Sequence, residues 1–362
     1  MSAPIKIRHI LIPVGWLFGN VARVRRWLYQ KGWIKSYKPN IPVICVGNIA
    51  IGGTGKTPHA GYILNLLFPN FKVAMLSRGY GRKSKGYVLA NTTAEDKLSA
   101  ELIGDEPLLL HQRFPNMPLA VDGDRHEGVL KLQAYAPDTE VVVMDDAYQH
   151  LSFTPTFRMV LTEYENPYFK DYPMPAGRLR EFPSAVGVAD AVLVTKVSAP
   201  KSEVNVDWWR QQLKLRSDQP LFFTYYSYGA PEPVTQAAKQ FALNADTEVI
   251  VMTGIARPKP MLEHLRQQFQ VQRHYNFPDH FKYSAMEITY IKDYCDKNPG
   301  RRVIFTTEKD WMRLRSEDLK KKVSLLPIFI IPIQVEFLFE NDRSTFNKII
   351  ESHVRRKKNE NQ

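Results

Sequence analysis

The chain has 362 residues, of which 44% are hydrophobic and 24% charged, with two cysteines and a formal net charge of +12. This length predicts two domains, and the ordinary apolar fraction predicts a packed fold rather than a disordered chain. Cys45 and Cys295 lie far apart in sequence, which argues against a disulfide framework or a metal knuckle and favours a reducing compartment. No apolar run approaches the roughly 20 residues that a membrane span needs, and the N-terminus does not resemble a cleaved signal peptide.

Positive charge is concentrated near the N-terminus. No Asp or Glu occurs before Glu95, whereas the first 38 positions hold Lys6, Arg8, Arg23, Arg25, Arg26, Lys31, Lys35 and Lys38. Such an asymmetry predicts an anionic partner, which could be a nucleic acid, a membrane surface or an acidic substrate.

Residues 14–29 have the pattern of an amphipathic helix. An apolar stripe with alternating spacings of three and four residues is formed by Val14, Leu17, Val21, Val24 and Leu28. Nearby lie the amphipathic rings Trp16, Trp27, Tyr29 and Trp33. From the residues alone two interpretations stay open: a helix that lies in a membrane interface, and a helix packed on the protein's own core with its arginines in water.

Apolar, β-branched runs then alternate with helical or loop segments. Strands are expected at residues 42–48, 73–77, 118–121, 140–146, 157–163 and 190–196, with a helix near 57–67. A second series has strands at 248–254, 271–275, 302–310 and 327–333, and helices at 258–269 and 284–297. This alternation predicts a mostly parallel sheet covered on both faces.

The fold class expected is α/β: a P-loop, Rossmann-like N-terminal domain with a mostly parallel sheet, a second, smaller α/β domain, and an N-terminal amphipathic membrane-interface helix. The expected boundaries are 1–40 for the basic segment, 41–220 for the P-loop domain and 221–245 for a linker. The smaller domain is expected at 246–335, with a C-terminal tail, frayed and solvated at its end, at 336–362.

The stretch from Ala50 to Thr57 resembles a phosphate-binding loop between a strand and a helix. Gly55, Lys56 and Thr57 supply the end of the pattern Gly-x-x-x-x-Gly-Lys-[Ser/Thr], while Ala50 replaces its first glycine. In such loops backbone N–H groups surround the anion, the lysine reaches the β/γ-phosphates and the hydroxyl binds Mg²⁺. The nucleotide-contacting residues expected here are Gly52, Gly53, Thr54, Gly55, Lys56 and Thr57.

A second feature supports nucleotide binding. The apolar run 140–144 ends in Asp145 and Asp146, and a carboxylate at the end of a strand beside a phosphate loop can hold Mg²⁺ or its water shell. A guanine-reading element is missing, because Ser198 stands where an aspartate would be needed after Thr195 and Lys196. An ATP-using enzyme is therefore favoured over a GTPase switch.

Seven motifs follow one another along the chain: GGTGKTP (52–58), SRGYG (77–81), GDEP (104–107), DDAYQH (145–150), PAGRLRE (175–181), FPDHFKY (277–283) and TTEKD (306–310). In this order they resemble the tetraacyldisaccharide 4′-kinase family of lipid A biosynthesis. The resemblance covers most of the chain. It implies ATP- and Mg²⁺-dependent transfer of the γ-phosphate to the 4′-hydroxyl of a tetraacyl-disaccharide 1-phosphate, forming lipid IVA.

The resemblance also implies roles for individual residues. Asp105 would be the general base, His280 would pair with it and raise its basicity, and Asp146 would act near the attacking hydroxyl. Metal binding would involve Thr57, Asp145 and Glu181. The substrate or phosphate cleft would be lined by Arg78, Gln149 and His150. Two positions depart from the family pattern: Ala147 stands where glycine is common, and Phe281 where a second histidine is common.

The same resemblance implies a peripheral enzyme on the cytoplasmic face of the inner membrane, with its basic helix on an anionic membrane surface. We expect a monomer that does not bind nucleic acid. Two other functions are compatible with parts of the sequence. One is a regulatory or metal-delivery P-loop GTPase; the other is a nucleic-acid-binding ATPase, suggested by the net charge alone.

Overall fold

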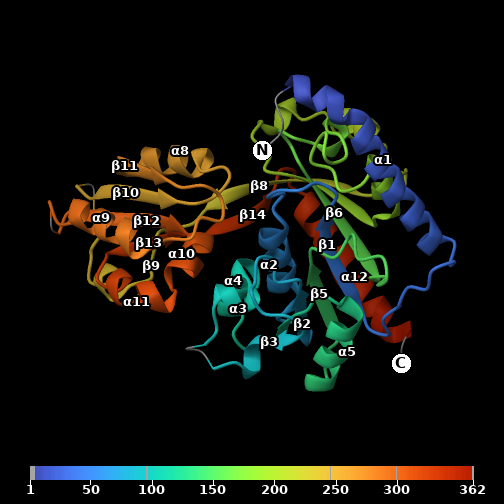
Figure 1. Cartoon of the computed structure of the whole chain (residues 1–362), viewed down its shortest axis with the longest axis horizontal. Coiled ribbons are helices and arrows are strands. Elements are labelled where there is room, and N and C mark those ends of the chain that lie inside the picture. The colour runs from blue at the N-terminus through green and yellow to red at the C-terminus, as the bar shows by residue number, and fades with distance from the viewer. Residues whose placement is uncertain (1–4, 95–96, 245, 299, 361–362) are drawn as a thin grey trace.

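The computed structural model describes residues 5–94, 97–244, 246–298 and 300–360, and the side chains among them from residue 10 onward. Figure 1 shows two lobes joined by paired strands, with the N-terminal helix α1 (Ile5–Gln30) along the outer side of the larger lobe. The expected basic residues Lys6 and Arg8 lie outside the described side chains. Among the described residues, no helix combines the length and apolar character needed to cross a membrane.

The large lobe is built on a nine-stranded sheet with the order β14-β8-β7-β6-β1-β5-β2-β4-β3. Its parallel strands are β1 (Val43–Asn48), β2 (Val73–Ser77), β4 (Leu119–Val121), β5 (Val141–Asp145), β6 (Phe157–Glu163), β7 (Ala191–Thr195) and β8 (Leu221–Tyr228). The short β3 (Val88–Leu89) and β14 (Ile333–Phe337) run antiparallel at the two edges. The expected mostly parallel α/β sheet is confirmed.

Both faces of this sheet are buried, which explains why its strands read as continuous apolar runs. Ile44 and Val46 of β1 point into one core with α2 (Lys56–Leu67), α4 (Asp105–Arg113) and α12 (Asp342–Glu360). Val43 and Cys45 point into the opposite core with α5 (Arg125–Tyr135) and α6 (Val206–Leu213). Short helical segments complete the lobe: η1 (Ala90–Thr92), α3 (Ala100–Ile103), η2 (Tyr168–Lys170), η3 (Pro183–Val188) and η4 (Lys201–Glu203).

The small lobe has a five-stranded sheet with the order β11-β10-β12-β13-β9. Its strands are β9 (Glu232–Pro233), β10 (Glu248–Thr253), β11 (Gln270–Asn276), β12 (Arg302–Thr307) and β13 (Ile328–Ile331). Its helices are α7 (Gln236–Lys239), α8 (Lys259–Gln268), α9 (Ala285–Cys295), α10 (Glu308–Leu314) and α11 (Glu317–Val323).

Two crossings connect the lobes, and they change the expected boundaries. Residues 221–228 are not a linker but strand β8 of the large sheet, and the expected single strand 327–333 is split at Pro332 into β13 and β14, one in each sheet. The crossings are paired, since Gly229 N–H donates to the carbonyl of Pro332 at 2.9 Å. The tail is also ordered, because Phe346, Ile350 and Val354 of α12 are buried in the large core.

Candidate active site

The phosphate loop lies between β1 and α2, where the sequence placed it. Gly52 and Gly55 have φ angles of 118° and 94°, in the left-handed region that favours glycine. A side chain at Gly55 would also collide with the Tyr226 hydroxyl, 2.1 Å from the Cβ position. Ala50 instead pairs with Leu179 as an antiparallel β-bridge. Extended backbone suits alanine, so the missing first glycine is not a defect of this loop.

The carboxyl end of β5 faces the start of α2. Lys56 Nζ lies 3.6 Å from Asp146 Oδ1, and Thr57 Oγ1 lies 3.5 Å from Asp145 Oδ2. Burial raises the pKa of Asp145 to about 7, despite the opposing charge of Lys56. Burial also acts on Asp146, but Lys56 and Arg180 outweigh it and hold the pKa of Asp146 below its usual range. Asp146 is thus paired with protein cations, whereas Asp145 forms no ion pair with the described residues.

That second carboxylate fits a divalent cation. Among the described residues, Asp145 Oδ1 is buried with no hydrogen-bond partner, and Thr57 offers a hydroxyl beside it. Mg²⁺ prefers oxygen ligands and often takes only one or two carboxylates, completing its shell with water and phosphate. Accordingly, within the part of the chain that is described, no cluster of three or more His, Cys, Asp or Glu forms a ready metal cage.

Glu181, also expected at the metal, has another partner in the structure. Its two carboxylate oxygens accept from Arg26 Nε at 2.6 Å and Arg26 Nη2 at 2.7 Å. Both side chains are buried. Arg26 was expected only as one of the basic residues of the N-terminal segment, so this pair was not predicted. It occupies the carboxylate that was expected to serve the metal.

The other expected substrate residues follow the carboxyl ends of β2 and β5. Gln149 Nε2 donates to the carbonyl of Asn48 at 2.6 Å, while its Oε1 accepts from Arg180 at 3.1 Å. His150 Nε2 lies 3.0 Å from Ser152 Oγ, and burial lowers the pKa of His150. Arg78 is exposed immediately after β2. The carboxyl ends of parallel strands meet at one edge of the sheet, which is where α/β proteins bind ligands.

Two arginines at this edge were missed by the sequence reasoning. Arg180 bridges Asp146, at 3.1 Å, and Gln149. Arg125 is only 2% exposed and donates to backbone carbonyls of Asp122 and Gly123; burial and the nearby charge of Arg78 lower its pKa. Its Nε has no partner among the described residues. A sequence signal for Arg180 existed, since it adjoins Glu181 in the PAGRLRE motif.

Asp105 and His280 come from different lobes and meet between them. Asp105 is the first residue of α4, and its Oδ2 lies 3.5 Å from His280 Nδ1. The φ of His280 is 60°, a conformation that is uncommon for non-glycine residues and often found at functional sites. Phe281, next to it, stacks on Phe277 at 4.6 Å between ring centroids and packs into the small core.

The pairing does not make Asp105 more basic, contrary to the expectation. Burial alone would raise the pKa of Asp105, but the hydrogen bond from His280 and the charge of Arg313 outweigh it and hold the pKa below its usual range. Asp105 is therefore ionised at neutral pH. It is available to accept a proton, although as a weaker base than an isolated aspartate.

The phosphate loop lies on a parallel sheet, beside two acids at the end of the neighbouring strand, and a carboxylate–imidazole pair lies nearby. This fold and site are those of a P-loop phosphotransferase. Comparisons with known proteins identify the family. The family model described as tetraacyldisaccharide-1-P 4′-kinase matches residues 7–355, and the chain belongs to this family. This confirms the expected family and favours the kinase over the GTPase alternative.

Named relatives and a solved structure agree. The chain is 38% identical over 358 residues to the tetraacyldisaccharide 4′-kinase of Phocaeicola vulgatus, covering 97% of this chain and 96% of that protein. It is 39% identical to the protein of the same name from Bacteroides thetaiotaomicron, covering 97% and 94%. The crystal structure of LpxK from Aquifex aeolicus in complex with ATP superposes with a TM-score of 0.71 at 26% identity, covering 96% of this chain and 99% of that one.

Proposed function

We propose that the chain transfers the γ-phosphate of ATP to the 4′-hydroxyl of a tetraacyl-disaccharide 1-phosphate, forming lipid IVA. The observation that carries this proposal is the meeting of Asp105 with His280 across the lobes. The neighbouring Glu106 lies close enough to Asp145, beside the phosphate loop, for its charge to act on that carboxyl. A P-loop protein that only hydrolyses nucleotide needs a positioned water. An ionised carboxylate on the large lobe, paired with an imidazole from the facing lobe, instead suits the deprotonation of an acceptor hydroxyl.

The residues divide the work of phosphoryl transfer. The backbone N–H groups of the loop and Lys56 hold the phosphates at the start of α2, where the helix dipole favours an anion. Asp105 accepts the proton of the attacking hydroxyl. Its partner His280 comes from the small lobe, so the pair forms only when the lobes approach each other. Closure would then exclude water and protect ATP from hydrolysis.

We assign Thr57 and Asp145 as the protein ligands of Mg²⁺, because Asp145 Oδ1 is buried without a partner among the described residues and the Thr57 hydroxyl lies beside this carboxyl group. Mg²⁺ held by these residues would supply positive charge that offsets the negative charge developing on the transferred phosphate. Asp146 has a different task, because Lys56 and Arg180 already pair with it. It orients Lys56 towards the phosphates.

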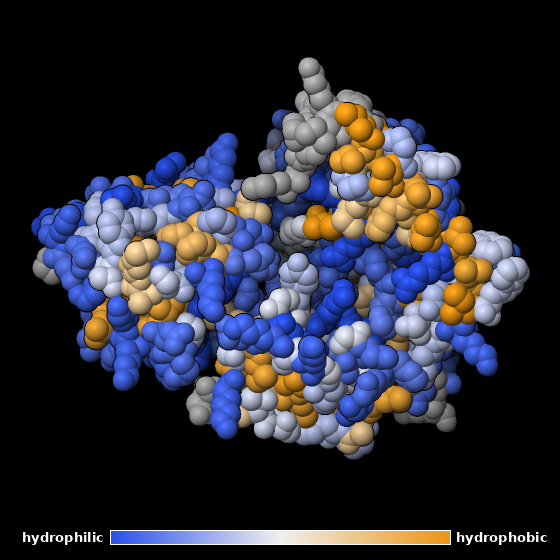
Figure 2. Space-filling view, in the orientation of Figure 1, coloured by the Kyte–Doolittle hydropathy of each residue, from blue (hydrophilic) through white to orange (hydrophobic). Residues whose placement is uncertain are grey.

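Helix α1 supports a peripheral position on an anionic membrane. Its buried side is made by Gly15 and Gly19, which lie against Pro173 and Phe182, and by the Arg26–Glu181 pair. Its opposite side is the apolar band, formed by the exposed residues Ile10, Val14, Trp16, Leu17, Phe18, Val21, Val24 and Trp27. In Figure 2 orange, hydrophobic residues follow the course of α1 along the outer side of the large lobe. The interpretation of a helix packed on the core through its apolar stripe is therefore wrong.

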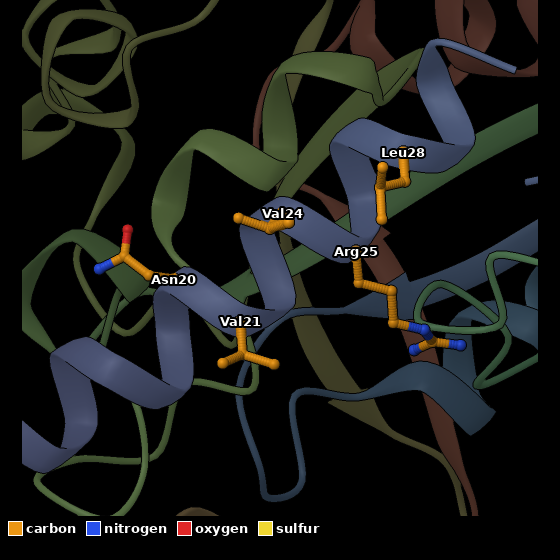
Figure 3. Close-up of a pocket in the computed structure, with 5 residues that line it drawn as sticks. All are labelled: Asn20, Val21, Val24, Arg25 and Leu28. Carbon is orange, nitrogen blue, oxygen red and sulfur yellow. The ribbon is translucent and has the colours of Figure 1, made fainter. Parts of the chain in front are cut away.

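Basic and amphipathic side chains accompany the band. In Figure 3 a shallow hollow on α1 is lined by Asn20, Val21, Val24, Arg25 and Leu28, which combines apolar side chains with a guanidinium. Trp33, just after the helix, is 73% exposed and contacts Trp27 edge-on. Apolar residues flanked by Trp and cations suit the interface of an anionic bilayer. We place the chain on the cytoplasmic face of the inner membrane, as a monomer.

The test is a lipid kinase assay. Purified protein, ATP, Mg²⁺ and the tetraacyl-disaccharide 1-phosphate are combined in detergent micelles, and the product is analysed by mass spectrometry. We expect one added phosphate at the 4′ position and little product when GTP replaces ATP. Folded protein that forms no bisphosphorylated lipid under these conditions refutes the proposed function.

A further inference from the structure

Arg313 of α10 contacts both members of the Asp105–His280 pair. Its Nε donates to Asp105 Oδ2 at 2.7 Å, shorter than the 3.5 Å between His280 and that oxygen. Its Nη2 lies 3.2 Å from His280 Nδ1. One guanidinium thus touches both members of the pair, which belong to different lobes.

The guanidinium is itself fixed from behind. Arg313 Nη1 donates to the carbonyl of Gly254 at 3.0 Å and to Asp310 Oδ1 at 3.1 Å. Asp310 is 0% exposed and is held in turn by Gly254 N–H, the Tyr283 hydroxyl and the Thr307 hydroxyl. The Arg313 side chain is only 7% exposed. A planar fork with this many fixed partners loses little freedom when Asp105 arrives.

We propose that Arg313 is the positioning residue of the phosphoryl transfer: it holds Asp105 and His280 in one arrangement across the lobes, and Asp310 holds Arg313. This inference rests on the proposed function. Arg313 does not touch the reacting atoms. It acts by keeping Asp105 ionised and directed, and by fixing the side of the imidazole that faces the carboxylate.

Other charged groups surround the pair and must be separated from Arg313. Lys309 Nζ lies 3.2 Å from His280 Nε2 and 2.9 Å from Glu106 Oε1, so its charge is shared with a carboxylate. Asp279 Oδ1 lies 4.0 Å from His280 Nε2. Nδ1 of His280 either donates to Asp105 or accepts from Arg313, and with either tautomer Arg313 Nε donates to Asp105 directly. The short contact of Asp105 is with Arg313.

Helices α4 and α10 also offer a matched control. Arg113, at the far end of α4, forms an ion pair with Glu308 at the start of α10. This pair joins the same two helices at the end of α4 opposite to Asp105, and among the described residues it contacts neither Asp105 nor His280. Arg113→Gln therefore weakens the contact between the lobes in general, whereas Arg313→Gln removes one cation from the Asp105 site.

The experiment compares wild type, Arg313→Gln, Arg313→Lys and Arg113→Gln in the lipid kinase assay as a function of pH. For Arg313→Gln we expect kcat at neutral pH to fall about 10- to 100-fold, with the KM for ATP nearly unchanged, because misplacement of a catalytic group has effects of this size. The acidic limb of kcat should move to higher pH, since loss of the cation raises the pKa of Asp105. Arg313→Lys should restore the limb but only part of kcat.

A second measurement does not depend on activity. The Asp105 carboxyl is titrated by ¹³C NMR in protein labelled at aspartate, with Asp105→Asn to assign the signal. We expect a higher pKa in Arg313→Gln than in wild type or Arg113→Gln. If wild type proves inactive on the lipid, the proposed function falls while this titration still tests Arg313.

The proposal is overturned if Arg313→Gln keeps both the wild-type acidic limb and the wild-type Asp105 titration. It is equally overturned if Arg113→Gln shifts them as much, because Arg313 would then act only through lobe contact. If thermal melting shows that Arg313→Gln is unfolded, Arg313→Lys tests the proposal instead, because lysine keeps the positive charge but lacks the planar guanidinium. If kcat of Arg313→Lys lies within twofold of wild type at all pH values, the positioning role is contradicted.

Discussion

Arg26 of the N-terminal helix and Glu181 of the PAGRLRE segment form a buried two-pronged ion pair, with N–O distances of 2.6 and 2.7 Å. The neighbouring Arg180 reaches Asp146 of the active site from the same segment. Arg26 also lies 5.0 Å from the ring centroid of Tyr148 in the DDAYQH turn. The helix that carries the apolar band is thus joined directly to the loops around the phosphate site.

Arg26→Met should therefore release α1. The change leaves Glu181 buried without a cation, and breaking a buried pair in this way costs about 3–5 kcal/mol. We expect faster proteolysis around residues 31–38 and a lower urea midpoint. Arg25→Met is the matched control, because the adjacent Arg25 is exposed and, among the described residues, forms no ion pair; its guanidinium carbon lies 5.8 Å from the centroid of the Tyr29 ring. Equal behaviour of the two variants contradicts the anchoring role.

The sequence predicted the parallel sheet and the phosphate loop well, because both are local signals. The central strands of the large sheet are short apolar runs, and the three glycines of the loop lie within four consecutive residues. The split of 327–333 into β13 and β14 was not predictable in this way, since the same apolar residues suit either sheet. Only the pairing of β14 with β8, more than 100 positions away, decides it.

The site was predictable in part. Asp105 and His280 follow from motif resemblance, and the structure brings them together. Arg313 lies 208 positions from Asp105, and a lone arginine on a charged helix carries no signal of such a contact. The order of α12 was within reach of the sequence, since Phe346, Ile350 and Val354 recur every fourth residue, as on one face of a helix. The many charges at its end obscured that pattern.

Asp105→Asn should lower kcat by about 10²–10⁴-fold, the usual contribution of a general base. The amide cannot accept the hydroxyl proton, whereas it still fits beside Arg313. The affinity for ATP, measured by calorimetry, should stay near wild type because Asp105 lies outside the phosphate loop. Glu101→Gln is the control: this exposed acid of α3 pairs with Lys83 and Lys282 and should leave kcat unchanged. Turnover near wild type in Asp105→Asn refutes the base role.

Asp145→Asn should raise the Mg²⁺ concentration for half-maximal activity about tenfold or more, as changes around metal ligands typically do. The amide lacks the charge that the unpartnered Oδ1 presents. Titration of Mg²⁺ at saturating ATP measures the effect. Asp138→Asn, an exposed change just before β5, is the control and should keep the wild-type Mg²⁺ dependence. If both variants titrate like wild type, Asp145 does not serve the metal.

His59 should make folding sensitive to acid. It is 2% exposed, between the Gly55 carbonyl and the Thr224 hydroxyl, and burial lowers its pKa to about 4. An unfolded histidine has a pKa of about 6.5. Between these values the unfolded state binds a proton that the folded state excludes, so the free energy of unfolding falls as pH falls.

The pKa difference between the folded and unfolded states sets how much stability His59 removes on acidification. Between pH 7 and pH 5 protonation of His59 should lower the free energy of unfolding by about 2 kcal/mol, because one pKa unit corresponds to about 1.4 kcal/mol. Urea unfolding of wild type and His59→Gln at both pH values isolates this contribution, since other groups, including the buried His353, are common to both proteins. The variant should lose about 2 kcal/mol less than wild type over the interval. Identical losses contradict the assignment.

Membrane binding should depend on the apolar band of α1 rather than on exposed apolar residues in general. Leu17 and Val21 are 64% and 63% exposed on the band. The double variant Leu17→Gln/Val21→Gln should bind anionic vesicles about tenfold or more weakly, because each apolar side chain inserted into the interface contributes on the order of 1 kcal/mol or more. Its activity on micellar substrate should change less, since the phosphate site is untouched.

Met286 and Leu325 provide the matched control for that experiment. They are 74% and 67% exposed, but they lie on the small lobe, away from α1. Met286→Gln/Leu325→Gln should co-sediment with vesicles of phosphatidylglycerol and phosphatidylethanolamine as wild type does. Raising the salt should weaken wild-type binding, because Arg25 and Lys31 are exposed near the band and each cation adds about 1 kcal/mol at low ionic strength. Equal loss in both double variants, or none in either, removes α1 as the membrane contact.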